Sequence, residues 1–185
     1  MKKKKMILIS PHDVFPPKDG GERRIYLLTR ELAKSYNVIF VGPFLENKKS
    51  VDLPINIVEV FPNKAKYKTF NIDLIKTIRD LLKQNPDAEI RLEFPWQGIN
   101  LLFMGKRFIL DEHNVEFLRF RRAHSKIWFI VFIYEFIICH LSKKVICVSQ
   151  TDKDYFIKYY KLNPDKIEII ENPVDTSIFY PDSAG

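Results

Sequence analysis

The sequence predicts an α/β fold, a Rossmann-like, doubly wound and mainly parallel sheet of about seven strands. Short β-rich runs alternate with stretches of helical periodicity, which is typical of parallel βαβ units. Some runs are continuously apolar, such as Phe108-Ile109-Leu110, and such strands suit a sheet that is covered on both faces. With 185 residues, the chain is slightly longer than one usual domain and too short for two full ones.

The elements alternate along the whole chain. Strands are expected at residues 6–10, 37–41, 55–60, 89–94, 107–111, 144–148 and 166–170. Residues 22–35 and 71–84 carry apolar side chains at helical spacing, which predicts two amphipathic helices. A further helix is expected over residues 151–160, because Ser149 and Asp152 have the spacing of a capping box.

The composition fits a packed globular domain. Hydrophobic residues make up 46% of the chain, which excludes a disordered protein. The net charge of +7 comes largely from four lysines at positions 2–5, so solubility of the terminus explains it better than an anionic partner. No helix–turn–helix, zinc-finger or RNA-binding signature is present, and we expect no nucleic-acid partner.

Two features concern the cellular compartment. Cys139 and Cys147 form no disulfide framework and no CxxC pair, which indicates reduced, buried thiols in the cytoplasm. The most apolar stretch, residues 127–141, is shorter than the roughly 20 residues that span a bilayer. It contains Glu135, which in a buried helix would need a partner such as an arginine.

The loop after the first strand ends in Gly20 and Gly21, directly before a helix. Paired glycines let a ligand approach the backbone closely, and the free amides of a helix N-terminus favour a phosphate or another anion. The dinucleotide fingerprint GxGxxG and the P-loop pattern are both missing, so a simple glycine turn in a flexible loop remains the alternative.

Polar residues also follow the fourth strand. Glu93 lies where that strand meets its loop, close to Trp96. A carboxylate beside a tryptophan is suited to sugar hydroxyls, although an exposed loop charge would have the same sequence.

The fifth strand ends in the polar run Asp111-Glu112-His113-Asn114. Such a run is costly unless it faces solvent or a ligand, and His113 is suited to donate to a hydroxyl or a developing oxyanion. In the alternative interpretation, Asp111 and Asn114 cap the next helix and His113 is exposed.

A metal site is a further alternative. His12 and Asp13 end one strand while Asp111 and His113 end another, so a metal-dependent hydrolase is conceivable. No third group of histidines supports it, and we expect no metal.

A basic segment with Arg119, Arg121, Arg122 and Lys126 precedes the aromatic helix. It is suited to an anionic membrane surface or a lipid-linked acceptor. Alternatively, the arginines form a solvated face and the aromatic residues pack in the core. Since apolar residues surround that helix, burial in the core is favoured.

Four segments in this order resemble the N-terminal half of a family 4 glycosyltransferase of the GT-B fold. These are Gly20-Gly21, the run DEHNVE at 111–116, VICVSQTD at 145–152 and IIENPVDTSIF at 169–179. The resemblance covers essentially the whole chain, and the last two segments are specific in combination.

The resemblance implies two Rossmann-like domains that transfer a sugar with retention of configuration, usually without a metal or other cofactor. Gly20 and Gly21 would lie against the donor diphosphate or the transferred sugar. His113 would be the catalytic histidine that reaches that sugar. From their own positions after the fourth and fifth strands, Glu93 and Asn114 are expected to bind substrate or donor. Ser149 would match a serine that caps a helix or contacts the ligand.

The resemblance also implies the domain organisation. Residues 1–171 would form the acceptor-side domain and residues 172–185 the start of the interdomain linker, while the C-terminal domain that binds the nucleotide sugar is absent. We therefore expect a carbohydrate or lipid-linked acceptor, no turnover without the second domain, and a cytoplasmic place at or near the inner membrane face. A stand-alone carbohydrate- or lipid-binding adaptor is the alternative.

Overall fold

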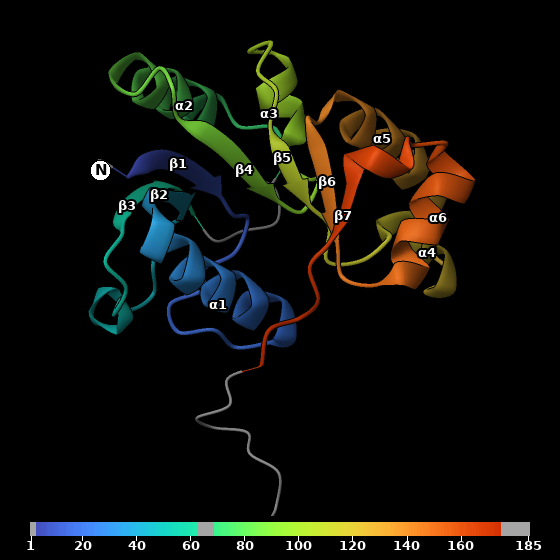
Figure 1. Ribbon diagram of the computed structural model, residues 1–185, viewed down its shortest axis with the longest axis horizontal. Coiled ribbons are helices and arrows are strands. Elements are labelled where there is room, and N and C mark those ends of the chain that lie inside the picture. The colour runs from blue at the N-terminus through green and yellow to red at the C-terminus, as the bar shows by residue number, and fades with distance from the viewer. Residues whose placement is uncertain (1–2, 63–68, 175–185) are drawn as a thin grey trace, which may run out of the picture.

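A computed structural model describes residues 3–62 and 69–174, which form a seven-stranded, all-parallel sheet (Figure 1). The strand order is β3-β2-β1-β4-β5-β6-β7. The strands are β1 (Lys4–Ile9), β2 (Tyr36–Pro43), β3 (Asn56–Phe61), β4 (Glu89–Glu93), β5 (Ile109–Asp111), β6 (Lys144–Cys147) and β7 (Ile167–Ile169). The order turns back between β1 and β4, which makes the carboxyl ends of these two strands the switch point of the sheet.

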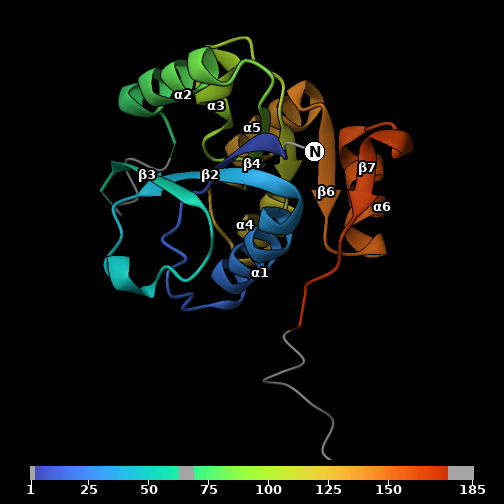
Figure 2. The ribbon, with the colours of Figure 1, turned by 60° about the vertical axis from the view of Figure 1, so that its left-hand side comes forward.

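Helices cover both faces of the sheet. They are α1 (Gly20–Ser35), α2 (Ile72–Gln84), α3 (Gly98–Leu102), α4 (Glu116–Arg122), α5 (Trp128–Leu141) and α6 (Gln150–Tyr160), with short 3-10 turns η1 (Lys48–Ser50) and η3 (Pro164–Lys166). Figures 1 and 2 show α1 on one side of the sheet and α2, α3 and α5 on the other.

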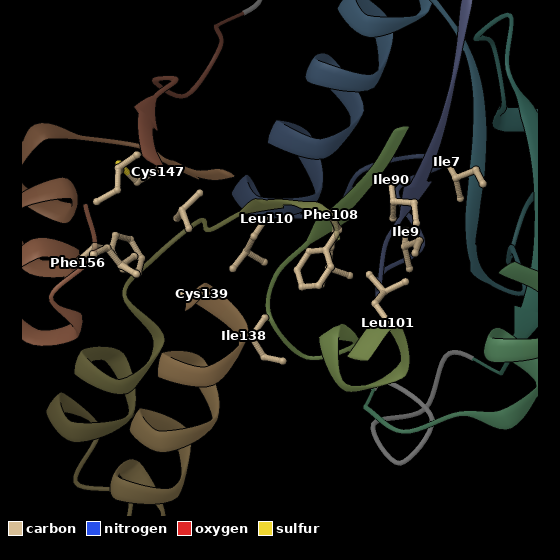
Figure 3. Close-up of a cluster of buried hydrophobic side chains, with 14 of the residues drawn as sticks. Ile7, Ile9, Ile90, Leu101, Phe108, Leu110, Ile138, Cys139, Cys147 and Phe156 are labelled. Atoms are coloured by element: carbon tan, nitrogen blue, oxygen red, sulfur yellow. The ribbon is translucent and has the colours of Figure 1, made fainter. Parts of the chain in front are cut away.

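The core has one layer on each side of the sheet, as the alternation of side chains requires. On one side, Leu8 packs with Ile25 and Phe40 beneath α1. On the other, Ile7 and Ile9 belong to a larger cluster that includes Leu101 of α3 and Ile138 of α5 (Figure 3). A sheet with apolar side chains on both faces is the doubly wound arrangement that the sequence predicts.

The sequence-based expectations agree with the structure for all seven strands and for the helices over 22–35, 71–84 and 151–160. The last helix begins as expected, because the Ser149 side chain accepts a hydrogen bond from the Asp152 amide at 3.1 Å. The short helices α3 and α4 have no sequence signal of comparable strength. Of the expected linker, residues 172–174 continue from β7, and residues 175–185 lie outside the described part of the chain.

Two expectations about the cysteines and the membrane can be compared with the structure. Cys139 and Cys147 are both free and buried, as expected for reduced thiols. Among the helices of residues 3–62 and 69–174, none combines the length and the apolar character needed to cross a bilayer.

Candidate functional site

An open cleft of about 780 Å³ lies at the carboxyl edge of the sheet, beside the switch point. Segments that are far apart in sequence form its wall: His12 follows β1, Phe94 and Trp96 follow β4, and Asn114 follows β5. Gly20 also lines it, at the first turn of α1. In open α/β sheets, ligands bind at such an edge, so this cleft is the candidate site.

Gly21 lies directly against His113. A Cβ atom at Gly21 would be 3.6 Å from His113 Nδ1 and 3.6 Å from Phe94 Cζ. The helix start is fixed by Asp19, whose side chain accepts a hydrogen bond from the Glu22 amide at 2.8 Å. Gly21 and His113 therefore meet at one edge of the sheet, as the sequence predicts, and Gly20 lies beside them at the cleft. A Cβ atom at Gly20 would meet nothing within 4 Å, so this position leaves the cleft open.

His113 is held on two sides. Its Nε2 is 3.1 Å from Glu93 Oε2, and its ring is 4.0 Å from the Phe94 ring, centroid to centroid. Because an ionised carboxylate only accepts, Nε2 carries the proton, and Nδ1 of a neutral imidazole is then an acceptor. Within the described residues Nδ1 has no hydrogen-bond partner. Nδ1 would therefore accept from a ligand hydroxyl when the ring is neutral and donate, as the sequence suggests, when the ring is charged.

A chain of buried charges runs behind this histidine. Arg91 Nε donates to Glu93 Oε1 at 2.8 Å, and Arg91 Nη2 donates to Asp111 Oδ2. Arg24 of α1 donates from Nη2 to Asp111 Oδ1 at 3.1 Å. Two guanidinium groups thus balance two carboxylates in the interior, which is the condition for burying such charges. We call these five residues, Arg24, Arg91, Glu93, Asp111 and His113, the charge chain.

The surroundings shift the pKa values of Glu93 and Asp111 in opposite directions. Burial opposes ionisation of Glu93, but the positive charge of Arg91 and the hydrogen bond from His113 outweigh it and lower the pKa of Glu93. For Asp111, burial and the nearby charge of Glu93 raise the pKa, in spite of Arg91 and Arg24. Glu93 is therefore the firmly ionised partner of His113.

This geometry corrects two expectations. Glu93 is fully buried, so it holds the histidine from behind and does not face a sugar. In the polar run after β5, Asp111, Glu112 and His113 are all buried, and only Asn114 is exposed and lines the cleft. Asp111 and His113 offset the free-energy cost of burying polar groups by pairing with buried side chains, and not by facing solvent. The alternative with an exposed His113 is wrong.

The capping alternative for Asp111 and Asn114 is wrong too, because Glu135 of α5 caps α4. Its Oε1 accepts from the Glu116 amide at 2.8 Å and its Oε2 from the Phe117 amide at 2.9 Å. Tyr160 adds a third hydrogen bond to Oε2 at 2.5 Å. The expected partner of Glu135 was an arginine, but the positive end of a short helix takes that place.

A second group of buried acids surrounds this cap. Glu112 Oε2 has no partner among the described residues, and Oε1 is 4.0 Å from Cys139 Sγ. Burial, followed by the charges of Glu135 and Glu116, raises the pKa of Glu112 well above its usual range. Burial also raises the pKa of Glu135 to about 7 and that of the Cys139 thiol well above its usual range. We call Glu112, Glu116 and Glu135 the acid cluster.

The metal alternative gains little from the structure. Asp13 uses its two oxygens to accept from the Phe15 and Glu46 amides, at 3.0 and 2.9 Å. Among the described residues, the group with ligand atoms within 4.8 Å of one another is Glu93, Asp111 and His113. Its carboxylates are already paired with guanidinium groups, which would repel a divalent cation. His12 and Asp13 do not join that group.

Ser149 lies at the same edge in a smaller pocket of about 250 Å³, together with Asn114 and Arg119. Its hydroxyl is 2.6 Å from Asp152 Oδ2 and caps α6, so the structural role is the one that the geometry shows.

The basic segment is exposed, as a membrane or solvent face requires. Arg119 pairs with Glu116 at 2.5 Å and lines the cleft, while Arg121 lies 5.5 Å from the Trp128 ring. Arg122 and Lys126 are exposed as well. The expectation that α5 is buried all round is wrong, since its outer face carries Phe129 at 55% exposure and Ile130 at 66%.

Sequence reasoning missed Arg24, Arg91 and Phe94. Phe94 has a φ of 64°, a left-handed conformation that is unusual for an aromatic residue. Strained residues of this kind cluster at functional sites, and here the strain places the ring between His12 and His113. The charged residues Arg91 and Glu93 alternate with Ile90 and Leu92 in β4, which was the available signal that one face of this strand is not ordinary core.

The sequence model of Glycosyltransferase Family 4 matches residues 18–178. The chain belongs to this glycosyltransferase family. The match includes the glycines, the histidine and the charge chain described above. No curated protein matches the sequence in a direct comparison.

Solved structures agree in fold. Sucrose-phosphate synthase from Thermosynechococcus elongatus superimposes with a TM-score of 0.76 at 14% identity, over 98% of this chain and 51% of that one. A glycosyltransferase from Rickettsia africae gives 0.61 at 20% identity, over 100% and 47%. Anabaena HepE in complex with UDP gives 0.61 at 13% identity, over 95% and 45%. The chain therefore spans about half the length of these proteins, and it has the Rossmann-like domain of the GT-B fold.

Proposed function

We propose that this domain is the acceptor-side half of a retaining glycosyltransferase, which transfers a sugar from a nucleotide-sugar donor to an acceptor hydroxyl. Family membership supports the reaction class. The observation that carries the proposal is the meeting of Gly21 and His113 Nδ1 beside an open cleft at the carboxyl edge of the sheet.

In this proposal His113 is the catalytic residue. Its Nδ1 lies where the missing side chain of Gly21 leaves room, and it accepts a hydrogen bond from a hydroxyl of the transferred sugar. Glu93 keeps the proton on Nε2 and fixes the orientation of the ring, as a buried carboxylate does for the histidine of a catalytic triad. The amides at the start of α1 and its dipole favour the negative charge that develops on the leaving diphosphate.

A second domain would complete the site. The three solved structures described above are about twice as long as this chain, and that of HepE is a complex with UDP. For this chain we propose a nucleotide-sugar co-substrate held by a donor-binding domain, with residues 172–174 at the start of the linker and no metal or other cofactor. Closure of the two domains would exclude water from the cleft. The acceptor is a carbohydrate or a lipid-linked sugar, and the reaction takes place in the cytoplasm or at its membrane face.

The test is an assay of the enzyme that combines this domain with its donor-binding half. Release of nucleoside diphosphate from UDP-, GDP- and ADP-sugars is measured with glycan and lipid-linked acceptors, and the linkage of the product is determined by NMR. We expect transfer with the donor's anomeric configuration retained, and none from the 185-residue chain alone. An inverted product, or turnover by the single domain, would contradict the proposal.

Gly21 provides the matched variants for this assay. A Cβ at Gly21 meets its neighbours at 3.4–3.6 Å, which is ordinary contact, so Gly21→Ala should fold and retain much of the activity. Gly21→Val adds two methyl groups over His113 Nδ1 and should lower turnover at least tenfold, about 1.4 kcal/mol in the barrier. Equal turnover of the two variants would mean that the turn only connects two elements.

A stand-alone binding adaptor is the second candidate, favoured by the aromatic wall of the cleft. Phe94, Trp96 and Phe120 all line it, and flat aromatic rings bind the apolar faces of sugars. An adaptor would bind glycans or lipid-linked sugars in this cleft without any transfer, and the assay above separates the two functions.

A further inference from the structure

The outer face of α5 is apolar and exposed. Its exposed side chains follow helical spacing: Phe129, Ile130, Ile133, Phe136, Ile137 and Leu141. Each is at least 37% exposed, and Ile130 reaches 66%. The opposite face supplies Val131, Ile138 and Cys139 to the core. A contiguous patch of this kind marks an interaction site rather than a scatter of single apolar residues.

The exposed charged residues in the sequence that leads into the patch are basic. Arg121 and Arg122 are the last residues of α4 and Lys126 lies in the turn that leads into α5, and all three are exposed. Between Phe117 and Lys144 the sequence has a single acidic residue, Glu135, and its carboxylate is buried beneath the helix, where it caps α4. An apolar face bordered by lysine and arginine complements a leaflet that contains anionic lipids. It is poorly suited to a basic or neutral polar partner.

The patch also adjoins the cleft. Ile127, which is 49% exposed, precedes the first residue of α5 and lines the cleft together with Phe120 and Arg119 of α4. Trp96 stacks on Tyr134 of α5, with ring centroids 6.3 Å apart. The rim of the cleft and the apolar face are therefore formed by the same elements.

We infer that the outer face of α5 docks onto an anionic membrane surface, with its apolar side chains in the interfacial layer and the three basic residues against lipid headgroups. Docked in this way, the cleft would open beside the leaflet. Taken with the proposed function, on which this second step rests, the acceptor would be an amphiphile whose sugar headgroup enters the cleft while its chain stays in the bilayer.

Vesicle co-sedimentation tests the docking without any enzymatic activity. The 185-residue chain is mixed with vesicles of phosphatidylcholine alone or with about a third phosphatidylglycerol. We expect binding to the anionic vesicles at 0.1 M salt and at least tenfold weaker binding to the neutral ones. At 1 M salt the Debye length falls from about 10 to about 3 Å, and the binding should weaken steeply. Equal binding to both vesicle types, or none to either, would overturn the inference.

Two sets of variants locate the surface. Ile130→Ser/Ile133→Ser/Ile137→Ser alters exposed side chains only, and Arg121→Gln/Arg122→Gln/Lys126→Gln removes the charges. Each should weaken vesicle binding about tenfold or more, since a basic residue near the surface contributes about a factor of five. The matched controls are Phe44→Ser and Lys48→Gln/Lys49→Gln, which alter exposed residues beyond β2. Controls that weaken binding as much as the α5 variants would contradict the assigned face.

The two tryptophans report the orientation. Trp128 begins α5 and Trp96 lines the cleft, and the chain has no others. With lipids that carry a quencher on the acyl chain, Trp96→Phe leaves Trp128 as reporter, and Trp128→Phe leaves Trp96. We expect strong quenching of Trp128 and weaker quenching of Trp96. If Trp128 is not quenched in bound protein, α5 is not the docking element.

A second copy of the chain is the competing occupant of the patch. Sedimentation velocity of the wild type and of the triple serine variant distinguishes it from a bilayer. A monomer that binds anionic vesicles supports the inference, and a stable dimer that the serine variant dissociates overturns it. Loss of the proposed sugar transfer with intact vesicle binding would overturn the proposed function and leave the membrane surface standing.

Discussion

Asp111 and Glu112 are neighbours in sequence, yet they are buried in opposite ways. Asp111 points to the α1 side of the sheet and joins the charge chain, where Arg24 and Arg91 neutralise it. Glu112 lies on the α5 side, near Cys139, with one oxygen unpartnered among the described residues. One peptide bond thus separates an ion-paired carboxylate from one whose pKa burial raises well above its usual range.

The difference shows two ways in which a protein can bury acids. The charge chain keeps its groups ionised by pairing, so each member depends on its partner. In the acid cluster burial raises the pKa of Glu112 and so favours its neutral form, and Glu135 accepts hydrogen bonds from the amides of α4. Removing one member of the charge chain should therefore lower the free energy of unfolding strongly. Removing a member of the acid cluster should lower it little, or only by the loss of a helix cap.

The largest expected effect is that of Arg91→Met, which breaks the charge chain. It leaves Glu93 buried with only His113 opposite, and breaking a buried pair in this way costs about 3–5 kcal/mol. Urea denaturation monitored by circular dichroism measures the loss, with exposed Arg79→Met as control. Adding Glu93→Gln should restore part of the stability. A loss below about 1 kcal/mol would show that the chain is not held by pairing.

Glu135→Gln should have the next largest effect on stability. Three donors point at this carboxylate, and an amide cannot accept from all of them, so we expect a loss of about 1–3 kcal/mol. Glu168→Gln makes the same change at an exposed position and should lie within about 0.5 kcal/mol of the wild type, which is what surface changes cost. If the two variants are equally stable, Glu135 does not cap α4.

His113→Ala separates chemistry from stability. In the proposed two-domain enzyme we expect turnover to fall at least tenfold, about 1.4 kcal/mol in the barrier, because the contact of Nδ1 with the substrate is lost. Glu112→Gln, one residue away on the other face, should change turnover less than twofold. Steady-state kinetics with melting curves for both variants make the comparison, and similar turnover for the two would remove His113 from the site.

The smallest effect, and the one that depends on pH, is that of Glu112→Gln on stability. Because the pKa of Glu112 is raised in the folded state, the folded chain holds a proton that the unfolded chain releases above about pH 4.3. This group therefore destabilises the fold increasingly as the pH rises. At pH 5 the variant should lie within about 1 kcal/mol of the wild type.

At pH 8 the same variant should be the more stable protein, by on the order of 1 kcal/mol or more. A glutamine side chain does not titrate, so the variant lacks the loss of stability that Glu112 causes as the pH rises. Urea unfolding of both proteins at the two pH values gives the difference. Using this difference cancels the opposite contribution of Glu93, whose lowered pKa stabilises the fold at higher pH. A difference that does not change with pH would mean that Glu112 is ionised.

The strands and their order of appearance could be predicted from sequence because periodicity reports burial, and both faces of this sheet are buried. The meeting of Gly21 and His113 followed from the rule that the carboxyl ends of parallel strands share one edge. The partners of buried charges could not be predicted in this way. Arg24 reaches Asp111 across 87 positions of sequence, and no local pattern encodes that distance.

The prediction for α5 failed for a related reason. A stretch that is apolar on every side gives no period, so the sequence could not distinguish a helix buried all round from one with an outward apolar face. The same lack of pattern concealed the role of Glu135, whose partners are backbone amides and carry no sequence signal.

Arg24 contacts two parts of the chain, and its second set of contacts connects the charge chain to the backbone after β7. Besides Asp111, its Nη1 donates to the Glu171 carbonyl at 3.0 Å and to Asn172 Oδ1 at 3.2 Å, just after β7. The backbone after β7 is thereby connected to a continuous series of ion pairs that ends at the imidazole of His113. Four side chains, those of Arg24, Asp111, Arg91 and Glu93, thus connect Asn172 to His113, so a movement of the backbone at Asn172 would change the position of the imidazole.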